Sequence, residues 1–201
     1  MEHIADIVRR LLIDQDVTSS EAASVNRRPE IDSARKLISA DDIPTLLRIC
    51  NDKSPGTRLL AINLLHRFSY DTRVQETMRN LWRDSSDFSV RHAALWRLLD
   101  IADLSAAQHD ALFSFVCEHW AEFLHETKAW HGANGDLLSG LRSRLSSGAQ
   151  PDSKRWIYVC AAAAADDHNS AHEFIESHSG CDDAFLAKVA NYCLRQIDRG
   201  H

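Results

Sequence analysis

The chain is poor in the residues and motifs that sheet proteins and membrane proteins need. It has 7 glycines and 4 prolines in 201 residues, which leaves few tight turns for a sheet. Its longest uncharged apolar run, 156–165, is too short to span a bilayer. Acidic residues interrupt the hydrophobic N-terminus, so it lacks the plan of a secretory signal peptide. These absences predict a helical, cytoplasmic protein without a membrane segment.

Cysteine usage argues against a disulfide framework. The cysteines are an odd number, widely spread along the chain, and none forms a C-x-x-C pair. Most fall within apolar stripes, where cysteine acts as a small core residue. The five are Cys50, Cys117, Cys160, Cys181 and Cys193.

Sequence signatures of catalysis and nucleotide binding are also missing. The chain contains no G-x-S-x-G, no G-x-x-x-x-G-K-[ST] and no G-x-G-x-x-G. It offers many serines and histidines, but nothing in the sequence gathers a nucleophile, a base and an orienting group. The sequence therefore favours binding over catalysis, and it gives no reason to expect a cofactor.

One cluster has residue types that a metal would accept. His168 and His172 lie four residues apart, on one face of a helix, and His178 and Cys181 follow. A chain with 11 histidines produces such pairs by chance, and no strict zinc signature is present. We therefore predict no metal site, while whether this cluster binds metal stays open.

A second motif points to metal more weakly. Glu122 and His125 match the Glu-x-x-His half-motif of carboxylate-bridged di-iron bundles. Such sites need a second copy, which the chain lacks. Glu118, Glu122 and Glu126 instead form a stripe of period four, which is typical of a solvated helix face.

Apolar residues recur at helical spacing in nearly every segment, and no sustained alternation predicts a strand. We expect a single domain, 1–201, in which 1–31 form an N-terminal helix and a polar connector, and 32–201 form helical repeats closed by a capping helix. Helices are predicted at 2–13, 32–38, 41–50, 55–68, 71–83, 87–101, 105–126, 136–146, 156–165, 168–178 and 183–198. Asp71 is the expected N-cap of the helix at 71–83.

Two stretches of the chain are copies of each other. Residues 52–61 and 84–94 each have an acidic, serine-bearing turn, then an arginine, then an apolar helical run. The arginines, Arg58 and Arg91, are 33 residues apart. Self-similarity at this period is typical of stacked helix pairs in a solenoid.

The turn and its arginine resemble HEAT and HEAT-like repeats. The pattern D-x-S-P-x-x-R spans 52–58, and a looser D-x-x-D-x-x-V-R spans 84–91. The resemblance is clearest over 41–104 and faint at 150–165. It implies an all-α superhelix of stacked antiparallel helix pairs. It also implies that Arg58 and Arg91 pair with the acidic turns of neighbouring repeats, through Asp52, Asp84 or Asp87.

Charge is unevenly distributed along the chain. Residues 1–100 carry 15 basic and 15 acidic residues, whereas 101–201 carry 8 and 14. If 43–50, 71–83 and 106–126 line a concave face, that face is positive at one end and negative at the other, which suits a protein partner. The predicted partner-binding residues are Arg48, Arg73, Arg79, Arg83, Glu118, Glu122 and Trp130.

The tryptophans divide between core and surface. Trp82 and Trp156 fall on apolar faces, and Trp96 suits the seam between repeats. Trp130 stands beside a glycine-containing segment and is the one most suited to an exposed hot spot.

Two functions from different classes follow. The first is a cytoplasmic protein-interaction module or adaptor. The alternative is an enzyme, because some DNA-alkylation-repair glycosylases are built from similar repeats. Such an enzyme needs a long basic groove and an aromatic-plus-carboxylate pocket, and the acidic second half disfavours nucleic acid. Some bilin lyases also carry HEAT-like repeats, but no residue here supports that activity. The partner, its pathway and the oligomeric state cannot be read from the sequence.

Overall fold

The described part of the chain is helical throughout. A computed structural model describes residues 35–100, 104–131, 136–146 and 154–199, and these contain α-helices, short 3-10 helices and turns but no strand. The N-terminal helix and connector predicted within 1–31 lie outside the described residues. The chain divides into two compact units, 1–101 and 102–201, each with its own packing. The single-domain organisation expected from the sequence stays a prediction.

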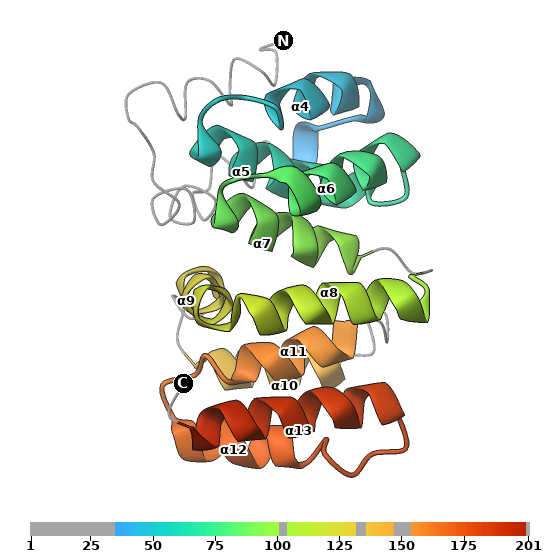
Figure 1. Cartoon of the computed structure of the whole chain (residues 1–201). Helices are drawn as coiled ribbons and strands as arrows, with labels where there is room; N and C mark the ends of the chain where they lie inside the picture. The colour runs from blue at the N-terminus through green and yellow to red at the C-terminus, as the bar shows by residue number, and fades with distance from the viewer. Residues whose placement is uncertain (1–34, 101–103, 132–135, 147–153, 200–201) are drawn as a thin grey trace. The chain divides into compact units, whose positions relative to one another are not determined.

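Four α-helices of the first unit lie wholly within the described residues, separated by short turns (Figure 1), and residues 35–37 of the helix predicted at 32–38 are also helical. They are α4 (Ile43–Ile49), preceded by the 3-10 helix η1 (Ala40–Asp42); α5 (Pro55–Leu64), extended by the 3-10 helix η2 (Leu65–Phe68); α6 (Thr72–Asp84); and α7 (Phe88–Leu98).

Local sequence explains where these helices begin. Ser54 caps α5 by accepting the backbone N–H of Thr57, with Pro55 in the first turn. Asp71 and Asp87 cap α6 and α7 through their carboxylates. The predicted helices at 55–68 and 71–83 and the predicted cap at Asp71 are therefore confirmed.

The core of the first unit is mainly aliphatic. Helix α7 packs against α5 and α6, and α4 packs against the same two helices. The inward faces meet largely through leucine, isoleucine, valine, methionine and alanine side chains that are almost completely buried, and Phe68 and Trp96 are buried with them. Burial of this apolar surface is the main stabilising contribution. Examples are Leu59, Leu60, Ile62, Leu95 and Met78.

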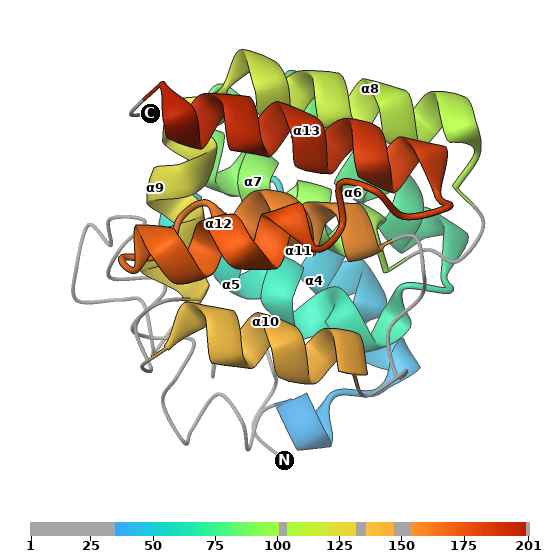
Figure 2. The ribbon, with the colours of Figure 1, turned by 90° about the horizontal axis from the view of Figure 1, so that it is seen from below.

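The second unit contains six α-helices in its described part. They are α8 (Ala106–Glu118), α9 (Trp120–His131), α10 (Leu137–Ser146), α11 (Arg155–Ala162), α12 (His168–Glu176) and α13 (Ala184–Asp198). Helix α11 contacts α10, α12 and α13, and Figure 2 shows it between α10 and α13. Residues 156–162 are all buried, as the uniformly apolar sequence of this segment predicts.

One predicted helix is wrong. The segment 105–126 does not form a single helix, because α8 ends at Glu118 and α9 begins at Trp120. His119 between them leaves the helical region, with φ −119° and ψ 38°. The new direction of α9 allows Trp120 and Phe123 to be buried, and the two rings stack. Burial of these rings outweighs the local preference to continue the helix.

The arginines of the two similar stretches, Arg58 and Arg91, each donate a hydrogen bond to a residue of another element. Arg58 donates from Nη1 to the hydroxyl of Ser85 at 3.3 Å, in the turn of the next repeat. Arg91 donates from Nε to the backbone carbonyl of Trp82 at 3.0 Å. Arg58 on α5 therefore reaches the turn between α6 and α7, and Arg91 on α7 reaches the end of α6. The pairing with acidic turns that the resemblance implies stays a prediction.

Candidate functional site

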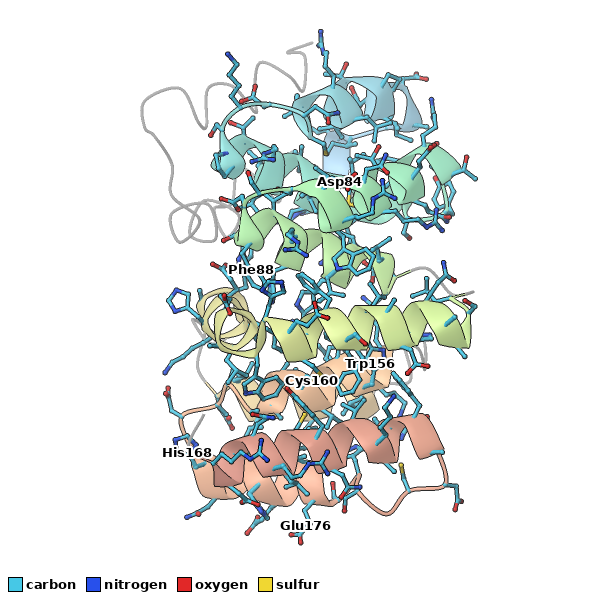
Figure 3. All side chains as sticks on the ribbon, in the orientation of Figure 1. Asp84, Phe88, Trp156, Cys160, His168 and Glu176 are labelled. Atoms are coloured by element: carbon cyan, nitrogen blue, oxygen red, sulfur yellow. The ribbon has the colours of Figure 1, made fainter. Side chains whose placement is uncertain are left out.

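The histidine cluster does not assemble as a metal centre. His172 lies 3.8 Å from Glu176 and 3.9 Å from Asp198, while His178 Nδ1 is 2.9 Å from the carbonyl oxygen of Phe174. His168 is exposed at the start of α12 (Figure 3). Among the residues that the structure describes, no three His, Cys, Asp or Glu side chains are grouped as a metal ion would require.

The predicted arginine surface of the first unit is partly neutralised. Arg73 forms a two-point contact with Asp71, Nε–Oδ1 at 3.1 Å and Nη2–Oδ2 at 2.7 Å, which lowers the pKa of Asp71 to about 2. Arg83 contacts Asp84 in the same way, at 2.8 and 2.9 Å. Arg48 is exposed on α4, and Arg79 is half-buried on α6. On this surface, nearby carboxylates therefore already offset the positive charges of Arg73 and Arg83.

The predicted acidic surface lies in the second unit. Glu118 and Glu122 are exposed, and Glu122 lies 3.9 Å from His119. Trp130 is half-buried rather than fully exposed, and its indole N–H donates to Glu126 at 3.2 Å. A role for Trp130 in binding stays a prediction.

A partly open pocket of about 420 Å³ in the second unit is the candidate site. Three helices that are distant in sequence supply its walls near their first turns: α8, α11 and α13. Concave sites lined by aromatic rings and a few polar groups are where proteins usually bind ligands. The lining residues are Ala106, His109, Asp110, Arg155, Trp156, Asp183, Phe185 and Leu186.

Aromatic rings fix the shape of this pocket. Trp156 and Phe185 meet edge to face, with centroids 6.0 Å apart and planes at 83°. Behind them Phe113 contacts both rings in the same manner, at 5.8 and 5.9 Å. Edge-to-face contacts are the favoured geometry for aromatic pairs, so the walls are held rigidly. Figure 3 shows Trp156 one turn before Cys160 on α11.

A hydrogen bond sets the protonation of His109. The indole N–H of Trp156 donates to Nδ1 of His109 at 3.1 Å, so Nδ1 is an acceptor and the ring proton is on Nε2. Burial lowers the pKa of His109, and the carboxylates of Asp110 and Asp183 oppose that shift. The imidazole is therefore neutral at pH 7 and supplies one N–H donor.

Carboxylates and cations share the rim. Asp183 is the N-cap of α13 and accepts two backbone N–H groups through Oδ1. Asp110 accepts Lys188 Nζ through Oδ1 at 2.9 Å. The same ammonium group lies 5.8 and 5.6 Å from the ring centroids of Phe113 and Phe185. Arg155 is exposed at the start of α11.

Two smaller hollows are less suited to a ligand. A hollow of about 200 Å³ in the second unit is lined by Lys128 and three aspartates, of which Asp166 is already paired with Lys128. A cavity of about 10 Å³ in the first unit, beside Met78, is too small for more than about one water molecule.

Sequence reasoning missed this pocket. It placed Trp156 in the core, which is confirmed, since only 3% of the residue is exposed. It also started the last helix at 183, which agrees with Asp183 as the cap. Nothing in the sequence indicated that these residues lie beside His109 and Asp110.

None of the described helices has the length and apolar character needed to cross a bilayer. Comparisons with protein-family models, curated proteins and solved structures found no match to this chain.

Proposed function

We propose that this chain is a cytoplasmic protein-interaction module, built as a HEAT-like solenoid, that receives a side chain of its partner in the aromatic pocket of its second unit. The pocket carries the proposal. It is large enough for a single long side chain, has rigid aromatic walls, and has polar groups at its rim. These are the features of the anchor pockets that dominate binding energy at protein interfaces.

Helix packing within each unit supports the solenoid part of the proposal. In the first unit α5 contacts α7, the equivalent helix of the next repeat, and α4 contacts α6. In the second unit α12 packs on α13, and α11 packs on α13 as well. Contacts between equivalent helices of neighbouring pairs are the basis of repeat architectures.

Site-specific photo-crosslinking tests the proposed function. Ala106 is exposed and lines the pocket, so a photoreactive benzoylphenylalanine at this position reports on what enters. We expect a discrete adduct with one protein in cell extract. The matched control carries the same group at Glu76, an exposed position on α6. Equal labelling from both positions, or none from 106, contradicts the proposal.

A base-excision enzyme is the second candidate, because the pocket combines aromatic rings with carboxylates, as a flipped-base pocket does. The acidic composition of 101–201 opposes binding to a phosphate backbone. Fluorescence anisotropy with a labelled DNA duplex at low salt separates the two functions. Tight and steeply salt-dependent binding supports the enzyme, and its absence supports the interaction module.

A further inference from the structure

We propose that the pocket formed by α8, α11 and α13 selects a cationic side chain, arginine in preference to others, from a basic segment of the partner. This inference rests on the proposed function, since it names the chemistry of the side chain that the pocket receives.

The first argument comes from a cation that the aromatic cluster already holds. Lys188 places its ammonium group over the rings of Phe113 and Phe185 and bonds to Asp110. This arrangement combines ring faces with a carboxylate, which is how proteins recognise organic cations. Lys188 is itself exposed and is not among the residues that line the hollow beside Trp156.

The second argument comes from the carboxylate oxygens of the rim. In the described part of the chain, the carboxylates of Asp110 and Asp183 each accept their hydrogen bonds through Oδ1. The Oδ2 atoms offer two acceptor positions on opposite helices, α8 and α13. A guanidinium group has five N–H donors in a planar fork, so it can reach two acceptors while its plane lies on a ring.

The third argument excludes an anion as the favoured ligand. Asp183 already satisfies the N-terminus of α13, and Ser105 with Gln108 forms a capping box at the start of α8. Two of the three helix ends at the pocket therefore have their N–H groups occupied. His109 is neutral because it accepts the Trp156 indole N–H, so the charged lining residues are Arg155, Asp110 and Asp183. Lys188, outside the lining, already pairs with Asp110, which leaves Asp183 as the carboxylate without a cationic partner among the described residues.

Nuclear magnetic resonance of the full chain tests this selectivity with small probes. The indole N–H of Trp156 lies in the pocket wall, and its signal is assigned by its loss in Trp156→Phe. We expect acetyl-arginine amide to shift this signal saturably. Acetyl-leucine amide and acetyl-glutamate amide are the apolar and acidic comparisons. An equal or larger saturable shift with either comparison overturns the inference.

Matched variants separate charge from fold. Asparagine caps helices as well as aspartate, so Asp110→Asn/Asp183→Asn removes both charges and keeps the α13 cap. We expect binding of the arginine probe to weaken by about fivefold or more. Asp182→Asn, exposed and outside the pocket lining, should bind as the wild type does. Unchanged binding by the double variant overturns the inference.

Failure of this inference and failure of the proposed function give different results. If the partner crosslinks at 106 but acetyl-arginine amide does not bind, the cation selectivity is wrong and the interaction module stands. If the arginine probe binds but no protein crosslinks at 106, the cation site stands and its role in protein recognition is wrong.

Discussion

The two units differ in how their cores are filled. The first unit is filled mainly by aliphatic side chains, such as Leu60 and Leu95, with Phe68 and Trp96 also buried, and a cavity beside Met78 measures about 10 Å³. The second unit gathers Phe113, Trp156 and other rings near one end of α8, α11 and α13, and a pocket of about 420 Å³ lies beside them.

Side-chain shape distinguishes the two regions. Branched aliphatic side chains fill protein interiors at crystal-like density. Aromatic rings favour edge-to-face contacts, and the pocket lies beside Trp156 and Phe185, which meet in this way. The proposed function assigns binding to the second unit.

The largest expected effect comes from removing the central ring of the aromatic cluster. Phe113 is buried and contacts Trp156, Phe185 and Tyr192. We expect Phe113→Ala to lower the free energy of unfolding by about 3–5 kcal/mol, measured by urea denaturation. Phe88→Ala in the first unit, where the ring is half-buried, should cost clearly less. Equal losses would show that the cluster is no more tightly packed than the surface of α7.

The contact between α7 and the end of α6 gives the next largest expected loss of stability. Arg91→Ala removes the donor to the carbonyl of Trp82 near the end of α6, so we expect a loss of about 1–3 kcal/mol. Lys128→Ala in the second unit removes only an exposed ion pair with Asp166 and should change the urea midpoint little. Equal urea midpoints for the two variants would show that the Arg91 side chain does not stabilise the contact between α7 and α6.

Two variants of Asp183, the N-cap of α13, test the effect of capping on stability separately from the effect of its negative charge. Asp183→Ala leaves two backbone N–H groups without their acceptor, and we expect a loss of about 0.5–2 kcal/mol. Asp183→Asn should be close to wild type in thermal unfolding. An asparagine variant as unstable as the alanine variant would mean that the negative charge, rather than the cap, stabilises this end of the second unit.

The smallest effect is a pH dependence at His109. Burial lowers its pKa in the folded state below the ordinary value of about 6.5, so the unfolded chain binds the proton more readily. The contribution of neutral His109 to the free energy of unfolding is fully present above about pH 6.5 and is lost as the pH falls through the lowered pKa. Asparagine can accept the Trp156 N–H without titrating. We expect the urea midpoint to fall less in His109→Asn than in the wild type between pH 7.5 and 5.5, and an equal fall would contradict this role.

Local sequence was enough to predict the helices and most of their starts. Capping residues such as Asp71 and Asp87, and the apolar run after Lys154, depend only on near neighbours. The break at His119 could not be predicted, because no glycine or proline marks it and burial of Trp120 decides it.

The candidate site depends on contacts that sequence spacing cannot supply. His109, Trp156 and Phe185 come from three separate helices, and only their packing brings them together. The arginines on α6 were predicted as a binding surface from charge alone. Two of them, Arg73 and Arg83, pair with Asp71 and Asp84, which lie two residues and one residue away. Helix spacing does not predict these pairs, because residues one or two apart do not face each other on a helix surface. Whether that surface binds a partner stays a prediction.

The affinity of the crosslinked partner for matched variants tests the central claim most directly. Phe185→Leu removes a pocket ring, Phe88→Leu removes a ring of the first unit, and Arg73→Glu/Arg83→Glu reverses the α6 surface. By calorimetry, with circular dichroism as the folding control, we expect Phe185→Leu to weaken binding at least tenfold, or about 1.4 kcal/mol, and Phe88→Leu to leave it unchanged. Wild-type affinity in Phe185→Leu, together with lost binding in the arginine variant, would contradict the account and place recognition on α6.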